Sequence, residues 1–263
     1  MKLAFQDTSI ELNEVNDNFD AVIALGETPL SFGLIPFSTE IRDCNFTEPT
    51  IMFGSTKLVK LSLQGYLPEH GIVFYDAEKF DQAYYNNILG DILLNHKAEF
   101  VKWGDIKNQE IYKPMFIKPS SDLKYFAGQL LQPGCRTVEG ELSQYNYIDI
   151  DITDDTNILI NFNTIPELIR EYRVFVIDHV VADISQYMKD GKVTPDIVDY
   201  STYARILDFV MFLESIYSPH EHYVVDITED VDEKLWVVEY NCINCSGMYK
   251  INRKLVFEEL LAL

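Results

Sequence analysis

The spacing of apolar residues in the first part of the chain predicts strands that alternate with helices. Apolar runs at 21–25 and 50–53 are each followed by a glycine, which is typical of short buried strands. The second run leads into residues 55–65, whose leucines recur at helical spacing before a closing glycine. Residues 76–95 predict a further helix. The alternation indicates an open α/β domain over residues 1–108.

The second part of the chain favours longer antiparallel strands. Residues 171–187 contain two runs of β-branched and apolar residues around a polar pair, which predicts a β-hairpin. Residues 199–217 carry apolar side chains at steps of three and four, as in an amphipathic helix. The runs 223–227 and 236–241 predict another antiparallel pair. We expect the helix to cover the outer face of the sheet that contains this pair.

Two of these predicted strands carry acids inside apolar runs. Antiparallel pairing about the intervening turn sets Asp226 opposite Glu239, and the two-residue period puts Asn241 on the same face as Glu239. Two carboxylates this close repel and favour protonation unless a cation or a basic side chain holds them. Carboxylates and an amide oxygen are ligands suited to Mg²⁺. The alternative is a polar sheet face that water solvates.

Basic residues are also placed inside predicted strands. Lys118 ends a short apolar strand, where its ammonium can act as a point charge on a phosphate. Arg173 lies within the run 171–177, with Glu171 on the same face two residues earlier. Charges inside strands are costly unless they are paired. The alternative is that Arg173 bridges Glu171 while Lys118 caps a sheet edge.

The overall charge limits the partners that this chain can bind. Its 263 residues include 21 Lys and Arg against 42 Asp and Glu, a formal net charge of −21. Such a field repels polyanions, so we expect no nucleic acid partner. The chain lacks an 18-residue apolar stretch, so we expect no membrane partner and a cytoplasmic location.

Cysteines and histidines offer little support for a transition-metal site. Cys242 and Cys245 form a C-x-x-C, but no second C-x-x-C or C-x-x-H completes a set of four zinc ligands. His220 and His222 form an H-x-H that could clip a metal. We interpret the cysteines as small residues at a packed strand end and the histidines as incidental.

Six motifs, in order along the chain, make the sequence resemble the ATP-grasp superfamily. They are FGSTKLVKLSLQG, LGDILLN, FIKPSSDLKYFAG, EYRVFV, SQY and EYNCINCSGMY. The sequence is most similar to a phage and bacterial clade in which a lysine replaces an active-site arginine. This resemblance implies the ATP-grasp fold, in which the α/β domain precedes two α+β lobes, about 109–165 and 166–263, that clamp a nucleotide between their sheets.

The resemblance also implies which residues bind the nucleotide. Lys118 would reach the phosphates of ATP, and Lys124 would fold over them from a glycine-containing loop. Arg173 would hold the transferring phosphate or the acyl phosphate, with Glu171 orienting it. The linker strand at 157–163 would pair its backbone with adenine.

The metal ligands and one departure follow from the same resemblance. Asp226, Glu239 and Asn241 would carry Mg²⁺, with Mn²⁺ as an alternative ion. Many members of the superfamily have another arginine where this chain has residues 185–187, and either Lys124 or Lys189 could supply the missing charge.

The activity that the resemblance implies is ADP-forming ligation of a carboxylate to an amine through an acyl phosphate. The substrates would be small molecules or peptides. Two alternatives stay open: a phosphotransferase on the same scaffold, and a nucleotide-binding module without turnover.

Overall fold

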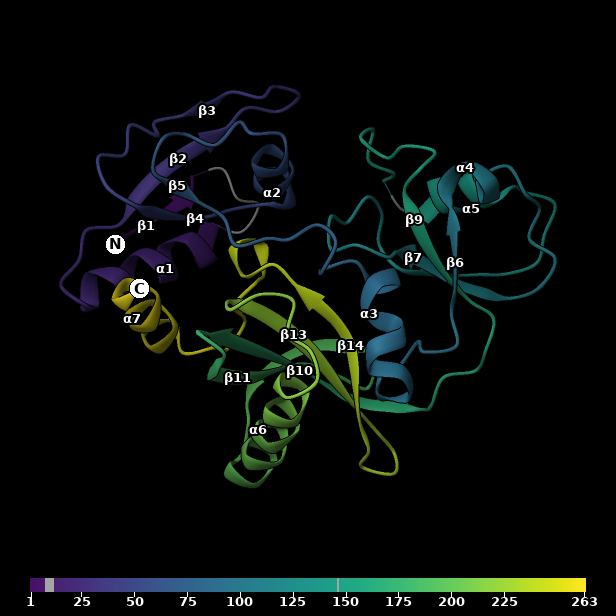
Figure 1. The fold of residues 1–263 in the computed structure, drawn as a ribbon. Coiled ribbons are helices and arrows are strands. Elements are labelled where there is room, and N and C mark those ends of the chain that lie inside the picture. The colour runs from purple at the N-terminus through teal and green to yellow at the C-terminus, as the bar shows by residue number, and fades with distance from the viewer. Residues whose placement is uncertain (8–11, 146) are drawn as a thin grey trace.

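The N-terminal part of the chain is an α/β layer structure. The computed structural model describes residues 1–7, 12–145 and 147–263, and its first sheet has the strand order β3-β2-β1-β4-β5 (Figure 1). The strands are β1 (Lys2–Gln6), β2 (Leu30–Leu34), β3 (Ile41–Arg42), β4 (Thr50–Phe53) and β5 (Gly71–Ile72). All neighbouring strands pair in parallel except β2 and β3. This arrangement confirms the open α/β character.

Helices cover both faces of this first sheet. Helix α2 (Thr56–Leu63) places Leu58 and Leu61 against Ala4 and Met52. On the other face, Leu3 and Phe5 share a core with α1 (Leu12–Ala24) and α7 (Arg253–Ala262). The sheet is therefore sealed on one side by the C-terminal helix of the chain (Figure 1).

The prediction of a strand at 21–25 is wrong, because residues 21–24 form the end of α1 and Leu25 lies in the turn that follows. Val15, Phe19 and Val22 recur at steps of four and three, and Phe19 and Val22 pack into the core beside Phe5. The short apolar run is therefore the buried face of a helix that begins upstream. The helix predicted over 76–95 is shorter than expected: α3 spans Gln82–Leu89, and the 3-10 helix η1 follows at Gly90–Ile92.

A second, four-stranded sheet has the order β6-β9-β7-β8. Its strands are β6 (Glu99–Lys102), β7 (Met115–Pro119), β8 (Gln129–Leu131) and β9 (Asn157–Asn161), and every neighbouring pair is antiparallel. Helices α4 (Trp103–Ile106) and α5 (Val138–Tyr145) share a core with this sheet through Ile117, Ile158 and Ile160. The period of two along β7 leaves Lys118 on the opposite face.

The third sheet is antiparallel throughout and has the order β12-β11-β10-β13-β14. Its strands are β10 (Leu168–Ile177), β11 (Val180–Lys189), β12 (Lys192–Ile197), β13 (Tyr223–Asp230) and β14 (Leu235–Asn241), with the 3-10 helix η2 (Ile243–Cys245) after β14. The predicted hairpin is confirmed. Its two turn residues, Asp178 and His179, both have positive φ, as two-residue turns between twisted strands require.

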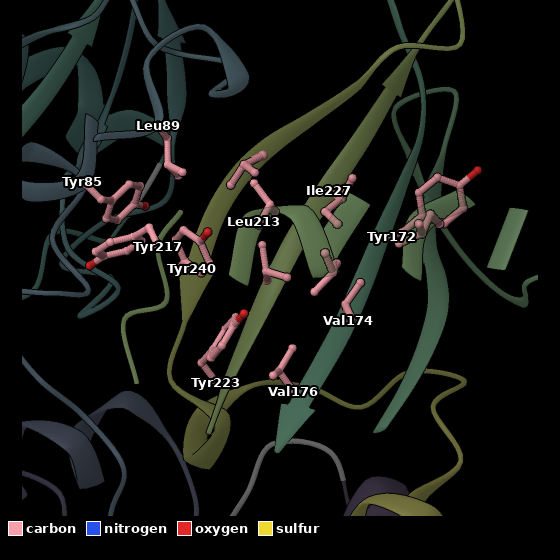
Figure 2. Close-up of a cluster of buried hydrophobic side chains, with 14 of the residues drawn as sticks. Tyr85, Leu89, Tyr172, Val174, Val176, Leu213, Tyr217, Tyr223, Ile227 and Tyr240 are labelled. Atoms are coloured by element: carbon pink, nitrogen blue, oxygen red, sulfur yellow. The ribbon is translucent and has the colours of Figure 1, made fainter. Parts of the chain in front are cut away.

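Helix α6 (Tyr200–Glu214) covers one face of this third sheet, as predicted. Its side chains Ile206, Val210 and Leu213 pack against valines, isoleucines and tyrosines of β10, β13 and β14. Figure 2 shows this dry cluster, in which Val174, Val176 and Ile227 point to the helix side. The other face of the same strands carries Arg173 and Asp226, and further along it Phe175 and Val224 pack into the core shared with α7.

The mixed α/β architecture, with an N-terminal α/β layer and two further sheets, confirms the predicted fold class. The domain boundaries near residues 108 and 165 stay predictions. In the described ranges, the helices are all too short or too polar to cross a bilayer.

Candidate active site

The three oxygen ligands predicted from the strand pattern come together on one face of the third sheet. Asp226 of β13 pairs with Glu239 of β14, as predicted, and Asn241 is two residues further along β14. A bulge at this point leaves Val238 without a partner in the ladder, because Ile227 pairs with Val237. The Asn241 amide donates a 3.0 Å hydrogen bond to Asp226 Oδ2, which confirms that the two side chains meet.

Asp226 is held by Arg173 from the neighbouring strand β10. The two residues are register partners, and Arg173 donates from Nε to Asp226 Oδ1 at 2.8 Å and from Nη2 to Oδ2 at 2.7 Å. Both side chains are buried. A bidentate pair of this kind fixes the orientation of the guanidinium and leaves Nη1 for the Gly247 carbonyl at 3.1 Å.

Two tyrosine rings flank the same guanidinium. Arg173 lies 5.3 Å from the ring centre of Tyr187 and 5.2 Å from that of Tyr249, distances at which a cation is attracted to a ring face. The Tyr187 hydroxyl donates a hydrogen bond to Glu171. The interpretation that Arg173 bridges Glu171 is therefore wrong, since Arg173 forms its ion pair with Asp226 while Glu171 accepts a hydrogen bond from Tyr187.

Lys118 crosses from the second sheet to pair with Glu239 on the third. The interpretation of Lys118 as a cap on a sheet edge is therefore wrong. Burial raises the pKa of Glu239, but the ammonium groups of Lys118 and Lys124 outweigh this and lower it to about 2. The carboxylate is thus ionised over the physiological range and is balanced by lysines from the other sheet.

Lys124 lies in the loop between β7 and β8, with a left-handed backbone at φ 50°. Its ammonium is 3.7 Å from Asp122 Oδ1, and it acts electrostatically on Glu239 and Arg173. Lys189, in contrast, is exposed at the end of β11 beside Arg170 and Lys192. That either lysine supplies the charge absent at 185–187 stays a prediction, and of the two it is Lys124 that interacts electrostatically with Arg173.

A cavity of about 590 Å³ opens between the second and third sheets. Its polar residues include Lys118, Glu171 and Glu239, while much of the remaining wall is apolar. The apolar lining comes from Leu94, Met115, Phe116, Leu130, Phe162, Ile165, Leu168 and Val238. A ligand site of this volume accommodates a molecule of nucleotide size. Residues 161–165, which continue from β9, line the wall, and their pairing with adenine stays a prediction.

Comparison with known families settles the classification of this arrangement. The sequence of residues 94–258 matches the family described as ATP-grasp domain, R2K clade family 2. The chain belongs to this family. No curated protein matches the sequence.

Solved structures show the same fold across nearly the whole chain. A RimK domain protein ATP-grasp from Sphaerobacter thermophilus matches with a TM-score of 0.58 and 14% identity, over 99% of this chain and 100% of that chain. ATP-grasp ligase PsnB, complexed with a minimal precursor, gives 0.54 and 11% over 99% and 98%. D-cycloserine synthetase DcsG gives 0.51 and 10% over 100% and 99%. At these identities the likeness concerns the fold of the ATP-grasp chain.

The ATP-grasp site has the chemistry of a hard-cation site. Asn241 is completely buried, and its Oδ1 atom accepts no hydrogen bond from any residue that the structure describes. An orphaned amide oxygen beside two carboxylates suits Mg²⁺, which prefers oxygen ligands. Across 1–7, 12–145 and 147–263, no cluster of three or more His, Cys, Asp or Glu could hold a metal ion. Asp226, Glu239 and Asn241 would offer two carboxylates and one amide, and Mg²⁺ in proteins usually keeps waters or substrate phosphates as further ligands.

Three residues of the R2K domain escaped the analysis of the sequence. Asp122, Tyr187 and Tyr249 occur inside quoted motifs, but no strand or helix period distinguishes them from packing residues. Their roles depend on contacts with Lys124 and Arg173, which the fold brings from other segments. In the sequence, only Arg173 could have suggested that aromatic side chains such as Tyr187 and Tyr249 lie nearby.

Proposed function

We propose that this ATP-grasp protein is an ATP-dependent ligase that joins a carboxylate to an amine. The observation that carries the proposal is the Lys118–Glu239 pair in the wall of a cavity between two sheets, with the Arg173–Asp226 pair on the strands next to Glu239. Buried ion pairs contribute little net stability compared with apolar packing. A set of four charges placed beside a cavity of nucleotide size is therefore better explained by binding of a charged ligand.

Each charged residue has a role in binding ATP. The adenine ring would occupy the apolar part of the cavity, with the phosphates directed to Lys118 and Lys124. Asp226, Glu239 and Asn241 would hold Mg²⁺, which supplies charge neutralisation and orientation of the phosphates when bound. In the structure Lys118 pairs with Glu239. With ATP and Mg²⁺ bound, Lys118 would instead pair with phosphate oxygen and Glu239 with the cation.

The chemical steps require positioning and charge neutralisation rather than a protein nucleophile. The substrate carboxylate attacks the γ-phosphorus, forming a C–O–P bond while the bond to the ADP leaving oxygen breaks. The amine nitrogen then attacks the acyl carbon, the bond to phosphate breaks, and the amine loses a proton to solvent. The guanidinium of Arg173, held in place by Asp226, would neutralise the phosphoryl oxygens during transfer.

The substrate class follows from similar proteins and the overall charge. Among the similar structures, PsnB is complexed with a precursor peptide and DcsG is a D-cycloserine synthetase. We therefore propose peptides or small molecules as the acid and amine, with no nucleic acid or membrane partner. The formal charge of −21 favours neutral or cationic substrates through long-range attraction.

Calorimetric titration of ATP with and without Mg²⁺ tests this proposal. We expect binding that requires Mg²⁺ in the wild type and that weakens at least about tenfold in Glu239→Gln combined with Asn241→Ala. Asp154→Asn is a matched control, because it removes the exposed partner of Lys107 far from the cavity lining. Absence of ATP binding in the wild type would contradict the proposal.

If ATP binds, acid and amine pairs can be screened for ADP release and for an amide product. Formation of ADP and an amide together supports the ligase. ADP formed with a phosphorylated product and no amide would favour the phosphotransferase instead. Binding without ADP formation across the screen would favour a nucleotide-binding module.

A further inference from the structure

Asp122 connects the lysine-bearing loop of the second sheet to the end of strand β14. Its side chain is almost fully buried, with 2% exposed. The Oδ2 atom accepts a 2.7 Å hydrogen bond from the backbone N–H of Cys242, the residue directly after Asn241. The Cys245 thiol approaches the same oxygen at 3.9 Å. The Oδ2 atom of Asp122 is thus fixed next to Asn241, one of the predicted metal ligands.

The other half of the carboxylate faces Lys124. Asp122 Oδ1 is buried and accepts no hydrogen bond within the described ranges, and Lys124 Nζ lies 3.7 Å from it. This separation is longer than a hydrogen bond, so the N–H donors of Lys124 are not consumed by Asp122. An orphaned carboxylate oxygen in this position attracts the lysine without occupying the groups that would bind phosphate.

The backbone conformation of Lys124 is consistent with a side chain that is held in place by its surroundings. Lys124 adopts a left-handed conformation, which is costly for a residue with a Cβ and persists where the surroundings enforce it. Its side chain is 46% exposed, and a lysine that loses its partner regains many rotamers. The only charge that the structure places within 4 Å of its ammonium, in the described residues, is that of Asp122.

We infer that Asp122 is the positioning residue for Lys124, holding its ammonium toward the phosphate end of the cavity and tying it to the strand end that bears Asn241. This inference rests on the proposed function for the identity of the ligand. The contact between the two side chains can be tested independently of any ligand. Nothing in the chemistry requires Asp122 itself to touch the substrate.

Amine labelling measured by mass spectrometry tests the contact directly. Asp122→Asn keeps an oxygen for the Cys242 N–H but removes the charge that favours protonated Lys124. We expect Lys124 to label about threefold faster or more, since half a pKa unit changes the neutral fraction about threefold. Lys107, which pairs with Asp154, is the internal control and should label at an unchanged rate. Unchanged labelling at Lys124 would overturn the inference.

A double-mutant cycle on MgADP affinity tests the functional part. We expect Asp122→Asn to weaken MgADP binding about tenfold in the wild-type background and less than about twofold in Lys124→Met. Equal losses in both backgrounds would show that Asp122 acts independently of Lys124 and would overturn its positioning role. Asp122→Ser offers a second uncharged acceptor for the Cys242 N–H if the amide variant does not fold.

The two tests separate failure of the inference from failure of the proposed function. If wild-type protein does not bind MgADP, the ligase proposal fails, while the labelling rate still decides whether Asp122 holds Lys124. If MgADP binds normally and labelling of Lys124 does not change, the proposed function stands and the role of Asp122 is refuted.

Discussion

The two faces of the third sheet are built from alternating residues of the same strands but differ completely in chemistry. On β10, Tyr172 and Val174 point to α6, and Arg173 between them points to the opposite side. On β13, Val225 belongs to the dry cluster beneath α6, and Asp226 next to it holds the arginine. Figure 2 shows the buried side chains of the apolar face, among them Val174, Ile227 and Leu213 of α6. One face is apolar where it meets α6. The opposite face carries charge at Arg173 and Asp226, while Phe175, Ile177 and Val224 further along the same strands pack into the core shared with α7.

The free energy of folding accounts for the apolar face but not for the buried ion pairs on the opposite face. Burying a valine or leucine side chain stabilises a fold by about 1.5 to 3 kcal/mol. A buried ion pair replaces solvation with pairing, and its exchange for apolar residues is often neutral or stabilising. The pairs on the charged face therefore add little to the net stability of folding. Under the proposed function, their value is a preformed electrostatic site for the nucleotide.

We expect the largest effect on stability and activity from replacement of Arg173. Arg173→Met leaves Asp226 buried without its partner, which costs about 3 to 5 kcal/mol of unfolding free energy. Removal of the guanidinium should also lower ADP release about a thousandfold. Chemical denaturation and a coupled ADP assay measure the two effects.

The matched control removes both charges. Arg173→Met combined with Asp226→Asn should recover much of the lost stability, because no unpaired charge remains buried. ADP release should not recover. A single Arg173→Met variant as stable as the wild type would show that Asp226 is solvated or protonated, contrary to the buried pair in the structure.

An intermediate effect is expected on the apolar face. Val174→Ala removes two methyl groups from a fully buried position under α6, and we expect a loss of about 2 kcal/mol of unfolding free energy. MgATP affinity, measured by calorimetry on the folded variant, should change less than about twofold. A strong loss of affinity without loss of stability would show that the apolar face also contributes to nucleotide binding, contrary to the division of roles between the two faces.

The smallest effect is expected at Asp122, at the border of the charged face. Burial raises the pKa of Asp122 to about 6, and the charge of Glu239 adds to this, while Lys124 opposes it. A carboxyl whose pKa is raised on folding contributes stability below its unfolded pKa of about 4, and that contribution is lost as the pH rises through about 6. Asn cannot ionise, so Asp122→Asn should gain roughly 1 to 2 kcal/mol relative to the wild type between about pH 4 and pH 7.

Thermal and chemical denaturation of both proteins at the two pH values measures this change. Asp154→Asn, which alters an exposed carboxylate, should show no comparable dependence. A difference between wild type and Asp122→Asn that is the same at both pH values would mean that Asp122 titrates normally. The expected outcome is a variant that is more stable at neutral pH and binds nucleotide less well.

Local patterns in the sequence predicted much of the third sheet and part of its chemistry. Period-two alternation identified β10, β13 and β14, and the short turn between Asp226 and Glu239 set their register. Steps of three and four identified α6 and the face that it buries. The same logic failed at 21–25, because a run of five apolar residues is too short to distinguish a strand from the end of a helix.

The sequence by itself determined which side chains share a face, since faces follow from backbone periods within one or two adjacent strands. It placed Asp226, Glu239 and Asn241 together for this reason. Only the tertiary structure decided their partners. Lys118 meets Glu239 across 121 residues and Arg173 meets Asp226 across 53, because packing of the sheets, rather than any local period, brings these segments together. The position of Asp122 between Lys124 and Cys242 has the same origin.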